Sequence, residues 1–78
     1  MDAKNSSRYI AGTKQVIRAV REGKVEKVIM ACDVDEYIRR KIARECSSVP
    51  IEIGDNMKSL GKLCKISVGT AAIGILKD

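Results

Sequence analysis

The chain has 78 residues, of which 45% are hydrophobic and 32% are charged. A chain of this length buries only about 60% of the surface that it exposes when unfolded, so it has room for one compact core. This balance of apolar and charged residues is typical of a folded domain and excludes a disordered chain. No apolar run approaches the roughly 18 residues of a membrane span, and the first ten residues, MDAKNSSRYI, lack the hydrophobic segment of a secretory signal. We therefore expect a cytoplasmic protein.

The net charge of +5 favours an anionic partner such as a nucleic acid, although lysines on a small domain also serve solubility. Tyr9 and Tyr37 are the only aromatic residues, which excludes a surface that stacks bases on several rings. The chain has no histidine, so it lacks Ser–His and Cys–His catalysis and the commonest metal ligand. It also lacks the glycine motifs that bind nucleotide phosphates. We expect a binding module with no catalytic activity, no cofactor and no metal.

Three cysteines, Cys32, Cys46 and Cys64, stand at wide spacing that suits neither a disulfide framework nor a Cys-x-x-Cys metal site. We expect reduced thiols. Each cysteine falls within an apolar pattern, so the sequence predicts that all three are small buried hydrophobic residues.

Residues 1–7 are polar and are expected to form a loose tail before a single domain over residues 8–78. A short extended piece at 8–11 leads into a helix predicted over 13–22, which Gly23 ends. Gly12 lets another backbone come close, and Thr13 can cap the helix. Such a start leaves the first backbone N–H groups of the helix available to an anion.

The helix over 13–22 has a polar face formed by Lys14, Gln15 and Arg18, which are related by steps of three and four residues. Its apolar residues favour another side, so one face can pack while the other meets a phosphate or a base edge. An ordinary capped and solvated helix has the same pattern, which leaves both interpretations open at this point.

A central strand is predicted over 25–32, where the sequence is rich in β-branched and apolar residues. A second helix follows over 35–47, and Asp33 with Glu36 resembles a capping box at its start. Asp33, Asp35 and Glu36 could also bind a divalent cation, but the helix macrodipole explains acidic residues at a helix start more simply.

The second helix carries a basic run on the face that its apolar residues leave open. The run consists of Arg39, Arg40, Lys41 and Arg44. We interpret it as a solvated face, and the alternative is that it assists phosphate binding.

The last third of the chain predicts an edge strand over 49–53, a third helix over 56–65 and a strand over 70–76. Gly61 lies on the apolar side of the third helix, where close packing against a neighbouring backbone would explain a glycine. Strands that alternate with helices predict an α/β fold, a three-layer α-β-α sandwich with a four-stranded mixed sheet.

An exposed loop is expected before the last strand, and it contains two apolar residues, Ile66 and Val68, on either side of Ser67. These side chains either contact a ligand or tuck under the edge of the sheet. Loops at strand ends are common ligand sites in α/β folds.

Three stretches, GTKQVIR, VIMACDVD and LGKLCKISVGTAAIGI, together resemble the kink-turn RNA-binding superfamily of ribosomal protein L7Ae, especially its small bacterial members. The resemblance extends from about Tyr9 to Leu76. It implies an α-β-α sandwich that binds kink-turns, which are sharply bent RNA duplexes with a bulge beside sheared guanine–adenine pairs. The target would be ribosomal RNA, a riboswitch or another structured RNA, bound by a monomer. The alternative is a protein-interaction adaptor on the same scaffold, as in other relatives.

The resemblance also implies which residues contact RNA. Lys14 and Gln15 depart from the Asn and Glu of archaeal and eukaryotic members but are similar to the residues of bacterial members. Lysine donates to guanine O6 and N7 or to phosphate, and glutamine both accepts and donates. A basic residue that some relatives have near the third helix falls on Met57 in this sequence. Lys58 could replace it only if the register allows, and we leave Lys58 out of the core site. The implied RNA-binding set is Gly12, Thr13, Lys14, Gln15, Arg18, Asp33, Ile66, Ser67 and Val68.

Overall fold

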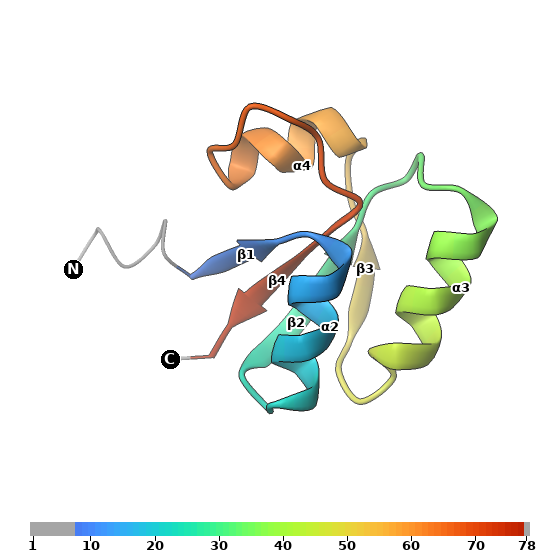
Figure 1. Cartoon of the computed structure of the whole chain (residues 1–78), viewed down its shortest axis with the longest axis vertical. Coiled ribbons are helices and arrows are strands. Elements are labelled where there is room, and N and C mark those ends of the chain that lie inside the picture. Colours follow the sequence, from blue (N-terminus) through green and yellow to red (C-terminus); the bar gives the residue numbers. More distant parts are fainter. Residues whose placement is uncertain (1–7, 78) are drawn as a thin grey trace.

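Four strands form one mixed sheet in the order β1-β4-β2-β3 in the computed structural model, which describes residues 8–77 (Figure 1). The elements in chain order are β1 (Tyr9–Ala11), α2 (Thr13–Arg21), β2 (Val25–Met30), α3 (Glu36–Glu45), β3 (Ile51–Ile53), α4 (Met57–Leu63) and β4 (Ala72–Leu76). The tail expected over residues 1–7 lies outside the described residues.

Strand β4 pairs antiparallel with both β1 and β2, whereas β2 and β3 are parallel. Strands β1, β2 and β3 therefore run in one direction and β4 runs against them. The expected edge position of the strand near Ile53 is confirmed, because β3 is the last strand of the sheet.

Helices α2 and α3 cover one face of the sheet, and α4 covers the other. The first core contains Val16 of α2, Val28 of β2 and Ile42 of α3, all fully buried. The second core contains Leu60 of α4 and Ile73 of β4. The strands contribute apolar side chains to both cores, because successive residues of a strand point to opposite faces of the sheet. The predicted three-layer α/β sandwich is confirmed.

The observed elements are slightly shorter than the predicted ones because loop contacts replace regular hydrogen bonds at their ends. Strand β2 ends at Met30, and the Cys32 N–H donates to the carbonyl of Asp55 in another loop, at 3.0 Å. Helix α4 ends where Lys65 takes a positive φ of 58°. The Ile66 N–H then turns back to the Gly61 carbonyl at 3.0 Å.

The three cysteines are free thiols in different surroundings. Cys46 is buried and Cys64 is half-buried, and burial raises the pKa of both thiols. The prediction that all three are buried is wrong for Cys32, which is exposed because it follows the end of β2 rather than continuing the strand.

The prediction of close packing at Gly61 agrees with the structure. Gly61 is buried, and a side-chain Cβ at this position would collide with the carbonyl oxygen of Val68. The glycine therefore lets α4 contact the backbone of the segment that leads into β4.

Among residues 8–77, no helix is both long enough and apolar enough to cross a membrane.

Candidate nucleic-acid interface

The strand directions bring four connecting segments to one edge of the sheet, which we call the loop edge. It is formed by residues 12, 31–35, 54–56 and 64–71, which follow β1, β2 and β3 and precede β4. Backbone hydrogen bonds join these segments: the Ala31 N–H donates to Ala71 at 2.8 Å, and the Gly54 N–H donates to Met30 at 2.8 Å. Helix α2 begins at this edge, so all the segments expected to bind RNA lie at one end of the sheet (Figure 1).

A chain of four residues ties these segments together. The Gly12 N–H donates to the Thr70 hydroxyl at 2.9 Å, and the Thr70 N–H donates to the Met57 carbonyl at 3.1 Å. The Met57 N–H in turn donates to Oδ1 of Asp33 at 2.9 Å. The start of α2, the loop before β4, the start of α4 and the segment after β2 are thus held by successive hydrogen bonds.

Gly12 is the N-cap of helix α2, and no side chain caps this helix. Gly12 has a φ of 100°, which L-residues with side chains rarely adopt, and the N-cap makes no side-chain hydrogen bond. The prediction that Thr13 caps the helix is wrong, because Thr13 is already its first helical residue. The backbone N–H groups of Thr13, Lys14 and Gln15 have no acceptor among residues 8–77. The helix start can therefore donate to an external acceptor.

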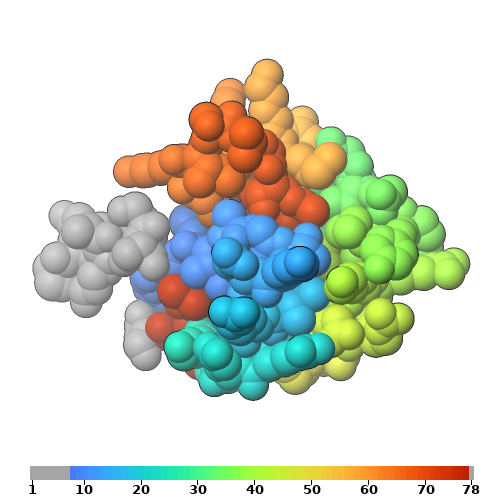
Figure 2. All heavy atoms as spheres, viewed as in Figure 1, coloured from blue at the N-terminus to red at the C-terminus, as the bar shows by residue number. Residues whose placement is uncertain are grey.

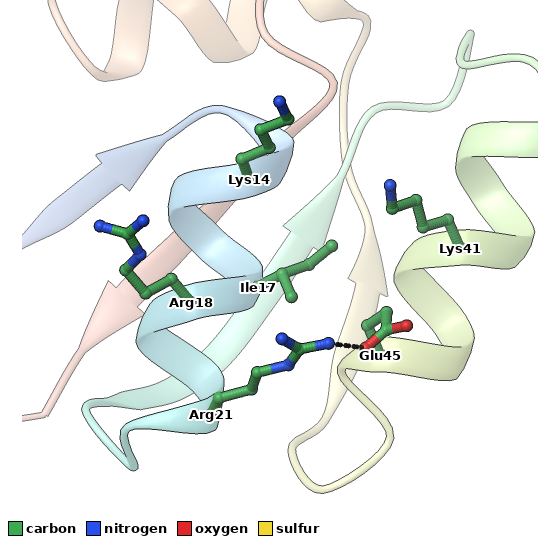
Figure 3. A pocket seen from close by; sticks show the side chains of 6 residues that line it. All are labelled: Lys14, Ile17, Arg18, Arg21, Lys41 and Glu45. Atoms are coloured by element: carbon green, nitrogen blue, oxygen red, sulfur yellow. Dashed lines mark hydrogen bonds and ion pairs between the residues drawn. The ribbon is translucent and has the colours of Figure 1, made fainter.

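The polar face of α2 borders two shallow grooves. Lys14, Gln15 and Arg18 are all exposed. Lys14 lies at the groove between α2 and α3, and Gln15 lies in a hollow beside Ile10 of β1. Arg18 lines both, so it links the two sides of the face. In the close view, Lys14 stands at the start of α2 and Arg18 one turn further along (Figure 3).

The loop before β4 presents apolar side chains to solvent. Val68 is 68% exposed and Ile66 is 38% exposed, with Ser67 exposed between them. The alternative that this pair tucks under the edge of the sheet is therefore wrong for Val68. The backbone of the segment is nevertheless fixed, since Gly61 packs on Val68 from α4 and Gly69 packs on Met57. Figure 2 shows the segment that leads into β4 directly beside the start of α2.

Two acidic residues after β2 accept hydrogen bonds from backbone N–H groups at the starts of two helices. The predicted capping box of Asp33 and Glu36 is wrong: Asp35 is the N-cap of α3 and accepts from the Ile38 N–H at 2.9 Å. Asp33 accepts from the first N–H of α4 instead. Residues 8–77 contain no group of three acidic or thiol side chains that could hold a metal ion.

Sequence reasoning missed one residue of this edge, Thr70. Its partner Gly12 is 58 positions away, and no local periodicity marks a threonine as a link between two loops. Asp33 also has a role that the sequence did not indicate, because Met57 lies 24 positions further on. Both roles follow from the strand order, which only the folded structure supplies.

The structure is thus a small α-β-α domain with a basic, exposed helix start beside an exposed apolar loop at one edge of its sheet. The chain matches the Ribosomal protein L7Ae/L30e/S12e/Gadd45 family over residues 1–78 and belongs to that family.

The chain is similar to bacterial proteins and to a solved structure from Giardia lamblia. The chain is 49% identical over 74 residues to a Geobacillus thermodenitrificans protein named "RNA-binding protein", covering 92% of this chain and 90% of the relative. It is 46% identical over 74 residues to "RNA-binding protein YbxF" of Geobacillus stearothermophilus, with the same coverage of 92% and 90%. This chain is also similar to a solved structure, the Giardia lamblia 15.5kD RNA binding protein, with a TM-score of 0.83 and 29% sequence identity. The match covers 96% of this chain and 67% of the Giardia chain.

Proposed function

We propose that this protein is a non-catalytic binder of kink-turn RNA, which it stabilises by selecting the bent conformation from an ensemble. The physiological target would be a structured RNA of the cytoplasm, such as ribosomal RNA or a riboswitch. The observation that carries the proposal is the hydrogen-bonded chain from Asp33 to Gly12, which holds a basic helix start beside an exposed apolar loop. The relatives' names and the family support RNA as the ligand.

The start of α2 reads the sheared guanine–adenine pairs in this proposal. Lys14 donates to O6 or N7 of guanine, and Gln15 both donates to and accepts from a base edge. The open N–H groups of Thr13, Lys14 and Gln15 let the backbone bind a phosphate, and Arg18 adds a charge one turn away. Recognition of base edges fits a chain with only two aromatic residues, since stacking on several rings is not possible.

The loop before β4 covers the bulged nucleotides. An unstacked base exposes apolar surface, which Val68 and Ile66 would remove from water, while the Ser67 hydroxyl is free to bond sugar or phosphate. Asp33 keeps its Oδ2 without a partner among residues 8–77, so this oxygen is available to a ribose 2′-hydroxyl.

The proposal predicts that Gln15→Ala loses discrimination between a kink-turn and the same RNA with its guanine–adenine pairs replaced by Watson–Crick pairs. A specific base contact contributes about 1 to 3 kcal/mol, so the ratio of the two affinities should fall by roughly tenfold. Titration of both RNAs at two salt concentrations measures this ratio.

Arg44→Ala is the matched control. Arg44 is exposed on α3 and pairs with Glu45 at 3.7 Å, away from the start of α2, so removing it should leave the ratio unchanged. An unchanged ratio for Gln15→Ala, or an equal loss for Arg44→Ala, would contradict the assignment of base reading to the start of α2.

A further inference from the structure

A groove between α2 and α3 extends beyond the site described above, which uses only Lys14 and Arg18 of its lining. It has a volume of about 380 Å³ and opens to solvent on the face of the sheet that both helices cover. Its lining consists of Lys14, Ile17, Arg18 and Arg21 from α2 and Lys41 and Glu45 from α3 (Figure 3). Four of these six residues are cations and one is an anion, which makes the groove strongly positive.

The single carboxylate of the groove is already neutralised. Arg21 donates to Oε1 of Glu45 at 2.7 Å, and Arg44 lies 3.7 Å from Oε2. This hydrogen bond from Arg21 lowers the pKa of the Glu45 carboxyl, since it favours the ionised form. The Glu45 carboxylate thus neutralises Arg21, and the other three cations of the groove are not neutralised by this ion pair.

Those three cations, Lys14, Arg18 and Lys41, form no ion pair within residues 8–77. The other basic residues of α3 differ in this respect, since Arg39 and Arg40 both pair with Glu36, at 3.3 and 3.0 Å. Lys41 is also half-buried, whereas its basic neighbours on α3 are exposed. Lys41 is thus the residue of the basic run that lines the groove and forms no ion pair within residues 8–77, although its charge interacts with Glu45 over a longer distance.

The groove is continuous with the loop edge. Lys14 belongs to the first turn of α2 and to the lining of the groove, and Arg18 and Arg21 follow at steps of four and three residues along the same stripe of the helix. In Figure 3 the side chain of Lys41 extends toward the end at which α2 begins. An RNA strand that leaves the start of α2 can therefore continue into the groove.

We propose that the groove between α2 and α3 is a phosphate-binding channel for the RNA stem next to the kink, with Lys41 as its α3 contact. This inference rests on the proposed function. Lys41 contacts the phosphodiester backbone and no base edge, because it lies on α3, outside the loop edge to which the proposed function assigns the reading of bases. Arg39, Arg40 and Arg44 remain solvated and paired with carboxylates.

The test compares Lys41→Gln with Arg39→Gln, since each variant removes one positive charge from the same helix. Binding of a kink-turn RNA with an intact stem is titrated across a salt series. Loss of one phosphate contact lowers the slope of log K against log salt by about 1 and weakens binding about eightfold near 0.1 M salt. Lys41→Gln should show both changes, and Arg39→Gln should show neither.

Two further measurements separate a lost contact from a damaged fold. Lys41→Arg keeps the charge and should restore the slope, and thermal unfolding should be similar for all variants. The preference for a kink-turn over the Watson–Crick control should persist in Lys41→Gln, because backbone contacts carry no sequence information.

Equal slopes for Lys41→Gln and the wild type would overturn the channel while leaving kink-turn recognition intact. An equal loss in Arg39→Gln would overturn it as well, since the effect would then be diffuse charge. Failure of the wild type to prefer the kink-turn would overturn the proposed function and the channel with it.

Discussion

Thr70 shows at the scale of one residue how the loop edge is held. It is a polar residue with only 6% of its surface exposed, and its hydroxyl uses both of its hydrogen-bonding roles. The oxygen accepts from the Gly12 N–H at 2.9 Å, and the hydroxyl donates to the Ala72 carbonyl at 2.9 Å. A buried polar group destabilises the fold unless it makes its hydrogen bonds, and the Thr70 hydroxyl makes both of its bonds. Its bond to Gly12 holds the start of α2 in place.

Thr70→Val is expected to lower the free energy of unfolding by about 1 to 3 kcal/mol, since the near-isosteric side chain removes both hydrogen bonds. It should also weaken kink-turn binding, because Gly12 then keeps only its longer bond to Ala72, at 3.2 Å. Urea unfolding and RNA titration measure the two effects. Thr70→Ser retains the hydroxyl and serves as the control; a valine variant as stable as the wild type would show that the hydroxyl is not an anchor.

At this scale the sequence predicted residues whose signal is local. The expectation that Gly12 lets another backbone come close is wrong, because a Cβ at this position would meet no atom within 4 Å; the φ of 100° is the reason for a glycine. Thr70 was not predicted, because its function depends on a partner that the chain brings near only after folding. The exposure of Cys32 was missed for a related reason: its apolar neighbours extended the strand pattern beyond the residue where pairing ends.

At the scale of elements, the three helices and four strands of residues 8–77 were predicted in the correct order, because each carries its own periodicity of apolar residues. Their ends were less predictable. The start of α3 depends on whether Asp33 or Asp35 caps it, and both are acidic residues near a helix start. Asp35 caps α3, because Asp33 accepts a hydrogen bond from the first N–H of α4 instead.

The loop between α4 and β4 supplies the prediction at this scale. Val68→Asp should weaken kink-turn binding by tenfold or more, since it removes apolar contact and places a negative charge beside the RNA. Thermal stability should stay nearly unchanged, because Val68 is mostly exposed. Fluorescence titration and a thermal melt measure the two quantities.

Two further variants separate the effect of the added charge from the effect of the lost apolar surface. Ser48→Asp adds the same charge just before β3, at the opposite edge of the sheet, and should bind RNA almost as the wild type does. Val68→Ala removes apolar surface alone and should give an intermediate loss. Unfolding of Val68→Asp would place the side chain in the core and contradict its proposed contact with RNA.

At the scale of the whole molecule, the topology explains how the residues of the proposed interface come together. Three strands run toward the loop edge and β4 starts there, so the connecting segments meet at this edge (Figure 1). Helices α2 and α3 carry the cations that line the groove between them. The net charge of +5 was visible in the sequence. The sequence did not reveal which cations lack an acidic partner, because ion pairs such as Arg21 with Glu45 join separate helices.

The central claim is that the loop edge recognises RNA by its kinked shape. The most direct test follows the distance between fluorophores on the two stem ends of a kink-turn RNA during titration with the wild-type protein, in parallel with the Watson–Crick control. We predict that the protein brings the stem ends of the kink-turn together over the concentrations at which it binds, and that the control RNA stays extended and binds more weakly. Equal affinity for the two RNAs, or binding of the kink-turn without bending, would contradict the account.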